Sequence, residues 1–138
     1  MKHISDIRRI DLPAYRREDG EVVVAQTTES VPFNIARMFA LRAPTGAERG
    51  KHAHRRCTQL MVCLNGLVDI VCDDGRDKST YTLDRSDAAL LVPPTIWNTV
   101  VFRAEQSVLV VLCDRPFEED DYLRTYEEFM AYRKAAHP

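Results

Sequence analysis

Apolar residues in this chain gather in short runs that recur from residue 21 to residue 114. Turn formers such as Asn65-Gly66 and Pro93-Pro94 separate the runs at intervals of 8 to 12 residues. The pattern predicts strands at residues 21–26, 36–43, 57–66, 67–74, 78–84, 88–94, 96–103 and 107–114. Regular short strands without intervening helices are typical of a β-sandwich or a β-barrel, so we predict an all-β fold.

The periodicity changes in the C-terminal segment FEEDDYLRTYEEFMAYRKAAHP, residues 117–138. Acidic residues at its start and basic residues near its end suit the dipole of a helix. The apolar positions at helical spacing are Tyr122, Tyr126, Phe129 and either Tyr132 or Arg133. We therefore predict one amphipathic α-helix that packs on the β-core.

Length, composition and charge limit the kind of protein. A chain of 138 residues with 45% apolar content predicts one globular domain over residues 1–138. The 19 basic and 21 acidic residues are mixed along the chain, which does not indicate a nucleic acid or a membrane surface as partner. The longest apolar stretch, residues 88–94, is far shorter than the roughly 18 residues that span a bilayer. The N-terminus lacks the apolar core of a signal peptide, so we predict a cytoplasmic protein.

The four cysteines, Cys57, Cys63, Cys72 and Cys113, lie inside or beside apolar runs. They form no CxxC pair and no framework of the kind found in small secreted domains. We therefore predict buried, reduced thiols.

Two histidines, His52 and His54, are the first candidates for chemistry, because side chains two residues apart on a strand point the same way. Their spacing to Gly46, Gln59 and Gly66 resembles the first motif of the cupin superfamily, with Gln59 in place of its glutamate. A weaker copy of the second cupin motif follows, with Asp87, Pro93, Thr95 and Asn98 at its main positions. The resemblance implies a double-stranded β-helix, or jelly roll, with the motif residues pointing into the barrel.

The ligand chemistry of these positions bears on whether a metal is bound. Metal-binding cupins use three imidazoles and a carboxylate, whereas this chain offers two imidazoles and the amides of Gln59 and Asn98. Amide oxygens are weak, uncharged ligands for the ions typical of such sites. We therefore expect no catalytic metal, although a metal cupin with an incomplete ligand set stays open. Acid–base chemistry suits the histidines, because an imidazole with a pKa near 6.5 accepts and returns protons at neutral pH.

Basic residues surround the histidine pair in the sequence. A phosphorylated ligand could bind to them, and the alternative is that they form a solvated strand rim. They are Arg37, Arg42, Arg49, Lys51, Arg55 and Arg56.

Five strings make the resemblance more specific. The chain is similar to the dTDP-4-keto-6-deoxyglucose 3,4-ketoisomerases, also described as the WxcM-like C-terminal domain, from about Ile7 to Tyr132. The strings are VPFNIAR (31–37), ERGKHAHRRCTQLMVCLNG (48–66), CDDG (72–75), PPTIWN (93–98) and DDYLRTYEEF (120–129).

This resemblance implies a metal-independent homodimer that needs no cofactor. It implies that a nucleotide-linked 4-keto-6-deoxyhexose becomes the 3-keto isomer used to make amino sugars, for example those of surface polysaccharides. His52 and His54 would be catalytic, acting through an enediol, and Arg124 would lie near the site. The candidate substrate-binding residues are Arg37, Phe39, Arg49, Gln59, Trp97, Asn98 and Arg124. Gln59 and Asn98 serve either the sugar oxygens or inward packing, and Trp97 either a stacking platform or the core.

The chain departs from the family pattern at Phe39, where the ketoisomerases usually bring a tyrosine hydroxyl towards the site. Phenylalanine cannot donate a proton or a hydrogen bond, and the N-terminal arginine of the family's DxRG turn is also missing from Arg17-Glu18-Asp19-Gly20. Two alternatives to the isomerase follow: a non-catalytic cupin that binds a nucleotide sugar, and the metal cupin named above. A 3,5-epimerase acting on the same substrates is a variant of the isomerase hypothesis.

Overall fold

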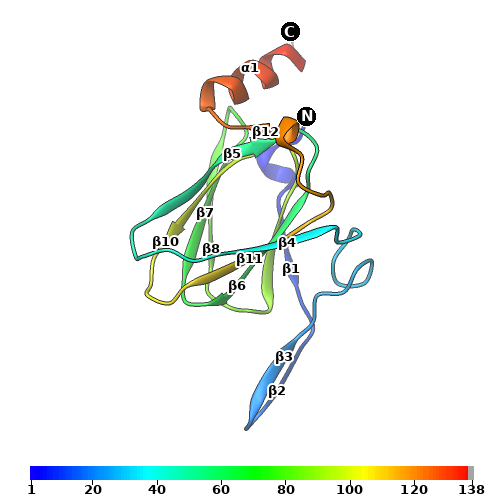
Figure 1. Ribbon diagram of the computed structural model, residues 1–138, viewed down its shortest axis with the longest axis vertical. Helices are drawn as coiled ribbons and strands as arrows, with labels where there is room; N and C mark the ends of the chain where they lie inside the picture. The colour runs from blue at the N-terminus through cyan, green and yellow to red at the C-terminus, as the bar shows by residue number, and fades with distance from the viewer. Residues whose placement is uncertain (137–138) are drawn as a thin grey trace.

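The chain folds into β-strands along most of its length and into one α-helix near its C-terminal end (Figure 1). The structure is a computed structural model that describes residues 1–136. The strands are β1 (Arg8–Asp11), β2 (Ala14–Arg17), β3 (Gly20–Val23), β4 (Arg37–Leu41), β5 (Glu48–His54), β6 (Gln59–Asn65), β7 (Val68–Asp73), β8 (Lys78–Leu83), β9 (Ala88–Val92), β10 (Trp97–Phe102), β11 (Val108–Cys113) and β12 (Tyr122–Leu123). The helices are the short 3₁₀ turns η1 (Ile4–Asp6) and η2 (Glu119–Asp121) and the α-helix α1 (Tyr126–Ala136).

Two five-stranded antiparallel sheets form the body of the protein, with strand orders β1-β9-β6-β11-β4 and β12-β5-β10-β7-β8. Because side chains alternate between the two faces along each strand, the residues on one face of each sheet point into a shared core. That core takes Leu90 and Val111 from the first sheet and Ile70 and Phe102 from the second, all of them almost fully buried. The predicted all-β jelly roll with a C-terminal helix is confirmed.

The outer face of the first sheet is also covered, which explains why β6 and β9 are apolar at successive positions rather than alternating. Val31, on the long connection between β3 and β4, is fully buried against Leu60 and Leu91. A strand that is buried on both faces reads as a continuous apolar run.

All eight strands predicted from the apolar runs are present, although most are shorter than predicted. β1, β2, β5 and β12 were not among the predicted ranges. The helix starts later than its pattern indicated, because Tyr122 and Leu123 pair with His54 and Ala53 of β5 instead of joining it. Thr125 then caps α1, since its hydroxyl accepts a hydrogen bond of 3.1 Å from the backbone N–H of Glu128. Residues 137 and 138 of the predicted helical segment lie outside the described residues.

All four cysteines are buried and free, as predicted. Among residues 1–136, no helix is both long enough and apolar enough to cross a membrane.

The hairpin of β2 and β3 projects from the body of the molecule (Figure 1). Its two strands pair only with each other. Tyr15 and Val22, which are register partners in this hairpin, expose 64% and 60% of their surface.

Candidate active site

A β-bulge in β5 sets the direction of the histidine pair. Asn98 of β10 pairs with His52, but the next residue, Thr99, pairs with Gly50, so Lys51 is the extra residue. Gly50 and Lys51 both have positive φ angles, of 80° and 58°, and a Cβ on Gly50 would lie only 3.2 Å from the Asn98 side-chain oxygen. Bulges re-aim side chains next to functional sites, and this one places His52 opposite Asn98 on the inner face of the barrel.

A cavity of about 370 Å³ opens beside His52. Its wall combines cationic and aromatic side chains, and the lining residues are Arg37, Phe39, Leu41, Arg49, Gly50, His52, Tyr122 and Arg124. A small inner recess shares His52 and Phe39 with this cavity and reaches the amides of Gln59 and Asn98. The structure therefore brings Arg37, Phe39, Arg49, His52, Gln59, Asn98 and Arg124 together, as the sequence predicted.

Trp97 was among the candidate substrate-binding residues but does not line this cavity. Of its two predicted roles, the structure supports the core and not the stacking platform. Trp97 neighbours Asn98 on β10, so its side chain points to the opposite face of the sheet. There the indole lies 5.5 Å from the ring of Tyr126 and 5.7 Å from that of Phe129, measured between ring centroids. Trp97 thus helps to seat α1 on the barrel.

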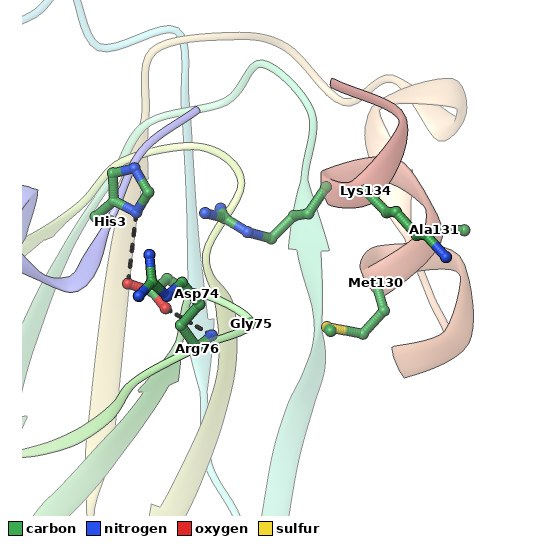
Figure 2. Close-up of a pocket in the computed structure, with 8 residues that line it drawn as sticks. His3, Asp74, Gly75, Arg76, Met130, Ala131 and Lys134 are labelled. Atoms are coloured by element: carbon green, nitrogen blue, oxygen red, sulfur yellow. Dashed lines mark hydrogen bonds and ion pairs between the residues drawn. The ribbon is translucent and has the colours of Figure 1, made fainter. Parts of the chain in front are cut away.

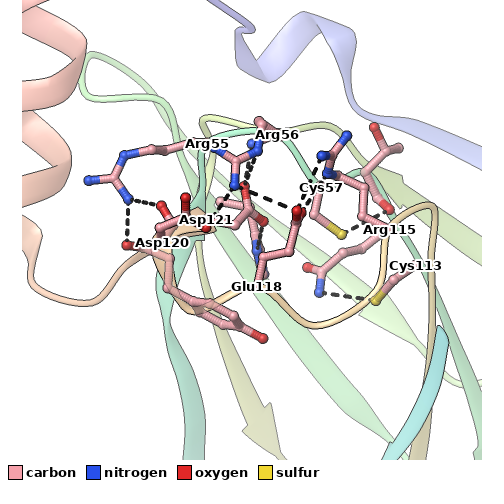
Figure 3. A network of polar contacts seen from close by, with 12 residues as sticks. Arg55, Arg56, Cys57, Cys113, Arg115, Glu118, Asp120 and Asp121 are labelled. Carbon is pink, nitrogen blue, oxygen red and sulfur yellow. Dashed lines mark hydrogen bonds and ion pairs between the residues drawn. The ribbon is translucent and has the colours of Figure 1, made fainter. Parts of the chain in front are cut away.

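His54 forms a buried pair with an aspartate that the sequence reasoning missed. Its Nδ1 lies 2.8 Å from Oδ2 of Asp121, and both side chains are almost completely buried. The other carboxylate oxygen of Asp121 accepts a hydrogen bond of 2.6 Å from the backbone N–H of Arg56 (Figure 3). Nε2 of His54 is buried without a hydrogen-bond partner among the described residues. When the Asp121 carboxylate accepts a hydrogen bond from Nδ1–H, Nε2 of His54 carries no proton and can act as a base.

Tyr122 lies beside both histidines. Its ring centroid is 5.2 Å from that of His52 and 4.5 Å from that of His54. A guanidinium nitrogen of Arg37 donates to its hydroxyl oxygen at 3.3 Å, while the Arg124 guanidinium lies 4.2 Å from the centroid of its ring. The cavity thus contains a tyrosine hydroxyl although position 39 carries none.

Arg37 also contacts a sulfur atom. Cys113 lies directly opposite Arg37 on β4 and Gln59 on β6, so the three side chains form one rung of the sheet. The Arg37 guanidinium lies 3.6 Å from Sγ of Cys113, and its Nε is buried without a partner among the described residues. Hydrogen bonding from the Cys57 thiol and the charge of Arg37 lower the pKa of Cys113.

The surroundings hold His52 and His54 in their neutral forms. Burial is the largest cause of the lowered pKa of both residues, and for His52 the neighbouring His54 ring adds to it. In Asp121, burial raises the carboxyl pKa, but the hydrogen bonds from His54 and from the Arg56 backbone outweigh burial and lower it overall. A neutral imidazole beside a carboxylate is the form that can accept a proton.

Stability should depend on pH through His52. Its pKa falls from 6.5 to about 4 on folding, so between these values the unfolded chain binds a proton at this residue that the folded chain does not. The free energy of unfolding should therefore decrease as the pH falls from 6.5 to 4, by about 3 kcal/mol from this residue. Urea unfolding of the wild type and of His52→Gln across this range measures the contribution, and equal pH slopes for the two proteins would contradict it.

A larger cavity, of about 560 Å³, lies between the N-terminal segment, the β7–β8 turn and α1 (Figure 2). Its two buried charged side chains, those of Asp74 and Arg133, are already hydrogen-bonded. Asp74 accepts hydrogen bonds from the backbone N–H groups of Ile4, Arg76 and Asp77, and Arg133 donates to the carbonyls of Lys2 and Thr95. These contacts join the N-terminus to the helix, and we assign the cavity no chemistry.

Comparison with known proteins identifies the family of the chain. The family model described as WxcM-like, C-terminal (FdtA) matches residues 5–134. A TDP-4-oxo-6-deoxy-alpha-D-glucose-3,4-oxoisomerase of Aneurinibacillus thermoaerophilus is 34% identical over 114 residues, which is 82% of each chain.

Two solved structures have the same fold. The sugar 3,4-ketoisomerase QdtA of Thermoanaerobacterium thermosaccharolyticum, in complex with TDP, superposes with a TM-score of 0.92 at 23% identity, over 99% of this chain and 100% of the other. The TDP-quinovose 3,4-ketoisomerase WlaRB of Campylobacter jejuni gives 0.86 at 26% identity, over 93% of this chain and 99% of the other. With the family model covering nearly the whole chain, this protein belongs to the WxcM-like C-terminal (FdtA) family.

Proposed function

We propose that the protein is a 3,4-ketoisomerase of a TDP-linked 4-keto-6-deoxyhexose. The observation that carries the proposal is the neutral His52 on the wall of an arginine-lined cavity, with the His54–Asp121 pair directly behind it. The activity of the 34% identical relative supports the same reaction.

The reaction moves two protons within one sugar. The 4-ketone acidifies the proton on C3, so a base can remove it to give an enediolate, and returning a proton to C4 leaves the ketone at C3. The hydroxyl proton on O3 must also leave as a proton reaches O4. Electrons are only redistributed within the substrate, so the balance requires no hydride carrier.

We assign the carbon-bound proton to the histidine pair. His52 faces the cavity and is the group that can contact C3, whereas His54 lies behind it with ring centroids 5.1 Å apart. His52 alone is a weak base, because its pKa is about 4. Positive charge on Arg37 and Arg124 contributes to this low value, so a bound diphosphate would raise the His52 pKa when the substrate arrives.

We assign the oxygen-bound proton to Tyr122. Its hydroxyl accepts from Arg37 and so keeps its own proton available for a substrate oxygen. Tyr122→Phe should lower kcat about tenfold or more and should leave KM nearly unchanged. The reason is that the variant loses a single hydrogen-bond donor to the oxyanion that develops in the transition state. Steady-state kinetics measure both constants. Tyr81→Phe, which removes a hydroxyl on β8, is the matched control, and an unchanged kcat in Tyr122→Phe would remove this residue from the mechanism.

The diphosphate of the substrate would lie near Arg37, Arg49 and Arg124. Arg124 is held in place by two contacts of 2.8 and 2.9 Å to Glu119, and Nε of Arg37 needs an acceptor. Guanidinium groups bind phosphate through several parallel hydrogen bonds. The amides of Gln59 and Asn98, deeper in the recess, would then contact the sugar oxygens.

The test is incubation with dTDP-4-keto-6-deoxyglucose in deuterium oxide in the presence of a chelator, followed by proton NMR. We expect the carbonyl to move to C3 and deuterium to enter next to it. Inverted ring centres with the carbonyl unmoved would indicate an epimerase. Binding without exchange would indicate a non-catalytic sugar-binding cupin, and activity lost with the chelator would indicate a metal cupin.

We also propose a homodimer that uses the projecting hairpin. A hairpin of two strands is at best marginally stable by itself, and Tyr15 and Val22 are apolar groups left in solvent. Light scattering should give about twice the chain mass of 15.8 kDa. A Tyr15→Glu/Val22→Lys variant should shift the mass toward that of the monomer, whereas Met38→Lys, which changes a residue that is also 60% exposed, should not. A monomeric wild type would refute the dimer.

A further inference from the structure

Behind the histidine pair lies a cluster of three donor groups that the isomerase chemistry does not use together. Atoms of His54, Cys57 and Asp121 that can bind a metal all lie within 4.8 Å of one another. The three residues expose only 3%, 2% and 3% of their surface. They come from the end of β5, the following turn and η2. Figure 3 shows Cys57 and Asp121 in the same polar network.

We propose that His54, Cys57 and Asp121 form a binding site for a thiophilic divalent cation such as Zn²⁺, and that occupation of this site inhibits the enzyme. The donor set of one imidazole, one thiol and one carboxylate is typical of zinc, with bonds of about 2.0–2.3 Å. Donors already within 4.8 Å of one another need to move little to reach such a geometry. These are not the cupin positions, since only His54 is shared with the motif.

Neighbouring groups support the site. The backbone N–H of Arg56 fixes the free oxygen of Asp121, as outer hydrogen-bond partners do for metal-binding carboxylates. The Asp121 carboxylate and the Cys57 thiolate would carry two negative charges, which balance the two positive charges of the cation.

Binding rearranges protons in a balanced way. The Cys57 thiol releases its proton to solvent when its sulfur bonds to the cation. The proton between Nδ1 of His54 and Asp121 moves to Nε2, the nitrogen without a partner, as the cation takes its place. His54 then has no free lone pair, so the pair of neutral bases is lost. The inhibition rests on the proposed function, whereas the binding does not.

The test is a titration of the purified full-length protein with Co²⁺, followed by displacement with Zn²⁺. We expect one Co²⁺ per chain, with a near-ultraviolet charge-transfer band from sulfur to cobalt. Cys57→Ser should lose the band and weaken binding by more than about tenfold, since even an outer partner of a metal ligand is worth that much. Cys63→Ser is the matched control, because Cys63 is an equally buried thiol at the other end of β6.

Thermal unfolding and circular dichroism establish that both variants fold, and Cys57→Ala replaces Cys57→Ser if the latter does not. A wild type without the band, a Cys57 variant that binds as tightly as the wild type, or a Cys63 variant weakened to the same degree would overturn the site. In the isomerase assay, Zn²⁺ should inhibit the wild type and not Cys57→Ser. Equal inhibition of both would overturn the regulatory part, and an inactive wild type would refute the isomerase while leaving the Co²⁺ result to decide the site.

Discussion

Replacing His52 by glutamine should lower kcat for isomerisation by about 100-fold to 10,000-fold, the usual contribution of a positioned acid–base group. His52 is the histidine that lines the cavity, and a glutamine of similar size cannot accept a proton from C3. Deuterium exchange next to the carbonyl should disappear with turnover. NMR of the product and of the exchanged substrate measures both quantities.

The control is His3→Gln. His3 is an exposed histidine that lines the larger cavity beside the N-terminal segment and not the candidate site. Both variants should bind dTDP with nearly the affinity of the wild type, since the nucleotide is held by other groups. A His52→Gln enzyme that keeps a tenth or more of its kcat would assign the base to another residue.

Asp121→Asn should lower kcat by about 100-fold or more, with a small effect on KM. An amide of the same shape can present N–H to Nδ1 of His54, which places the imidazole proton on Nε2 and leaves the wrong tautomer, as occurs when the aspartate of a Ser-His-Asp triad is changed to asparagine. Asp121 acts through His54 and is a positioning residue. Nitrogen NMR of the imidazole should therefore show the tautomer change in the free enzyme.

Asp120→Asn is the matched control for Asp121→Asn. Asp120 is the next residue in the chain, but its carboxylate is exposed and pairs with the Arg56 side chain at 3.0 Å. Exposed pairs of this kind contribute at most about 1 kcal/mol, so this variant should keep its activity and its fold. If Asp121→Asn retained both wild-type activity and the wild-type tautomer, the pair would have only a structural role.

Much of the site could be predicted because its residues lie in two spaced motifs. His52, Gln59 and Asn98 were located by their positions relative to glycines and prolines, and strand alternation indicated that they face inward. Trp97 kept two possible roles in the sequence, a stacking platform or a core residue. Alternation alone sends it to the face opposite Asn98, but the sequence does not say that a helix covers that face.

Asp121 and Tyr122 could not be predicted from their local pattern. An acidic run followed by spaced aromatics also describes the start of a helix, and Tyr122 fits that period. The competing interaction is the pairing of Tyr122 with His54, 68 residues earlier in the chain, and local periodicity contains no information about such distant contacts. The DYxRxY string was recognised for Arg124 alone. β1 and β2 were missed because Arg8-Arg9 and Arg16-Arg17 interrupt the apolar alternation in short edge strands.

The position of β12 has a consequence for how the protein becomes active during its synthesis. His52 and His54 are made early, whereas Asp121, Tyr122 and Arg124 follow more than 60 residues later in the chain. A nascent chain that ends before η2 can therefore already contain most of the barrel. It lacks Asp121, which orients His54, and it lacks the hydroxyl of Tyr122 and the Glu119–Arg124 ion pair. Termination of synthesis before η2 would yield a product that contains most of the barrel but lacks part of the site, and we expect activity only once η2 and β12 have been made.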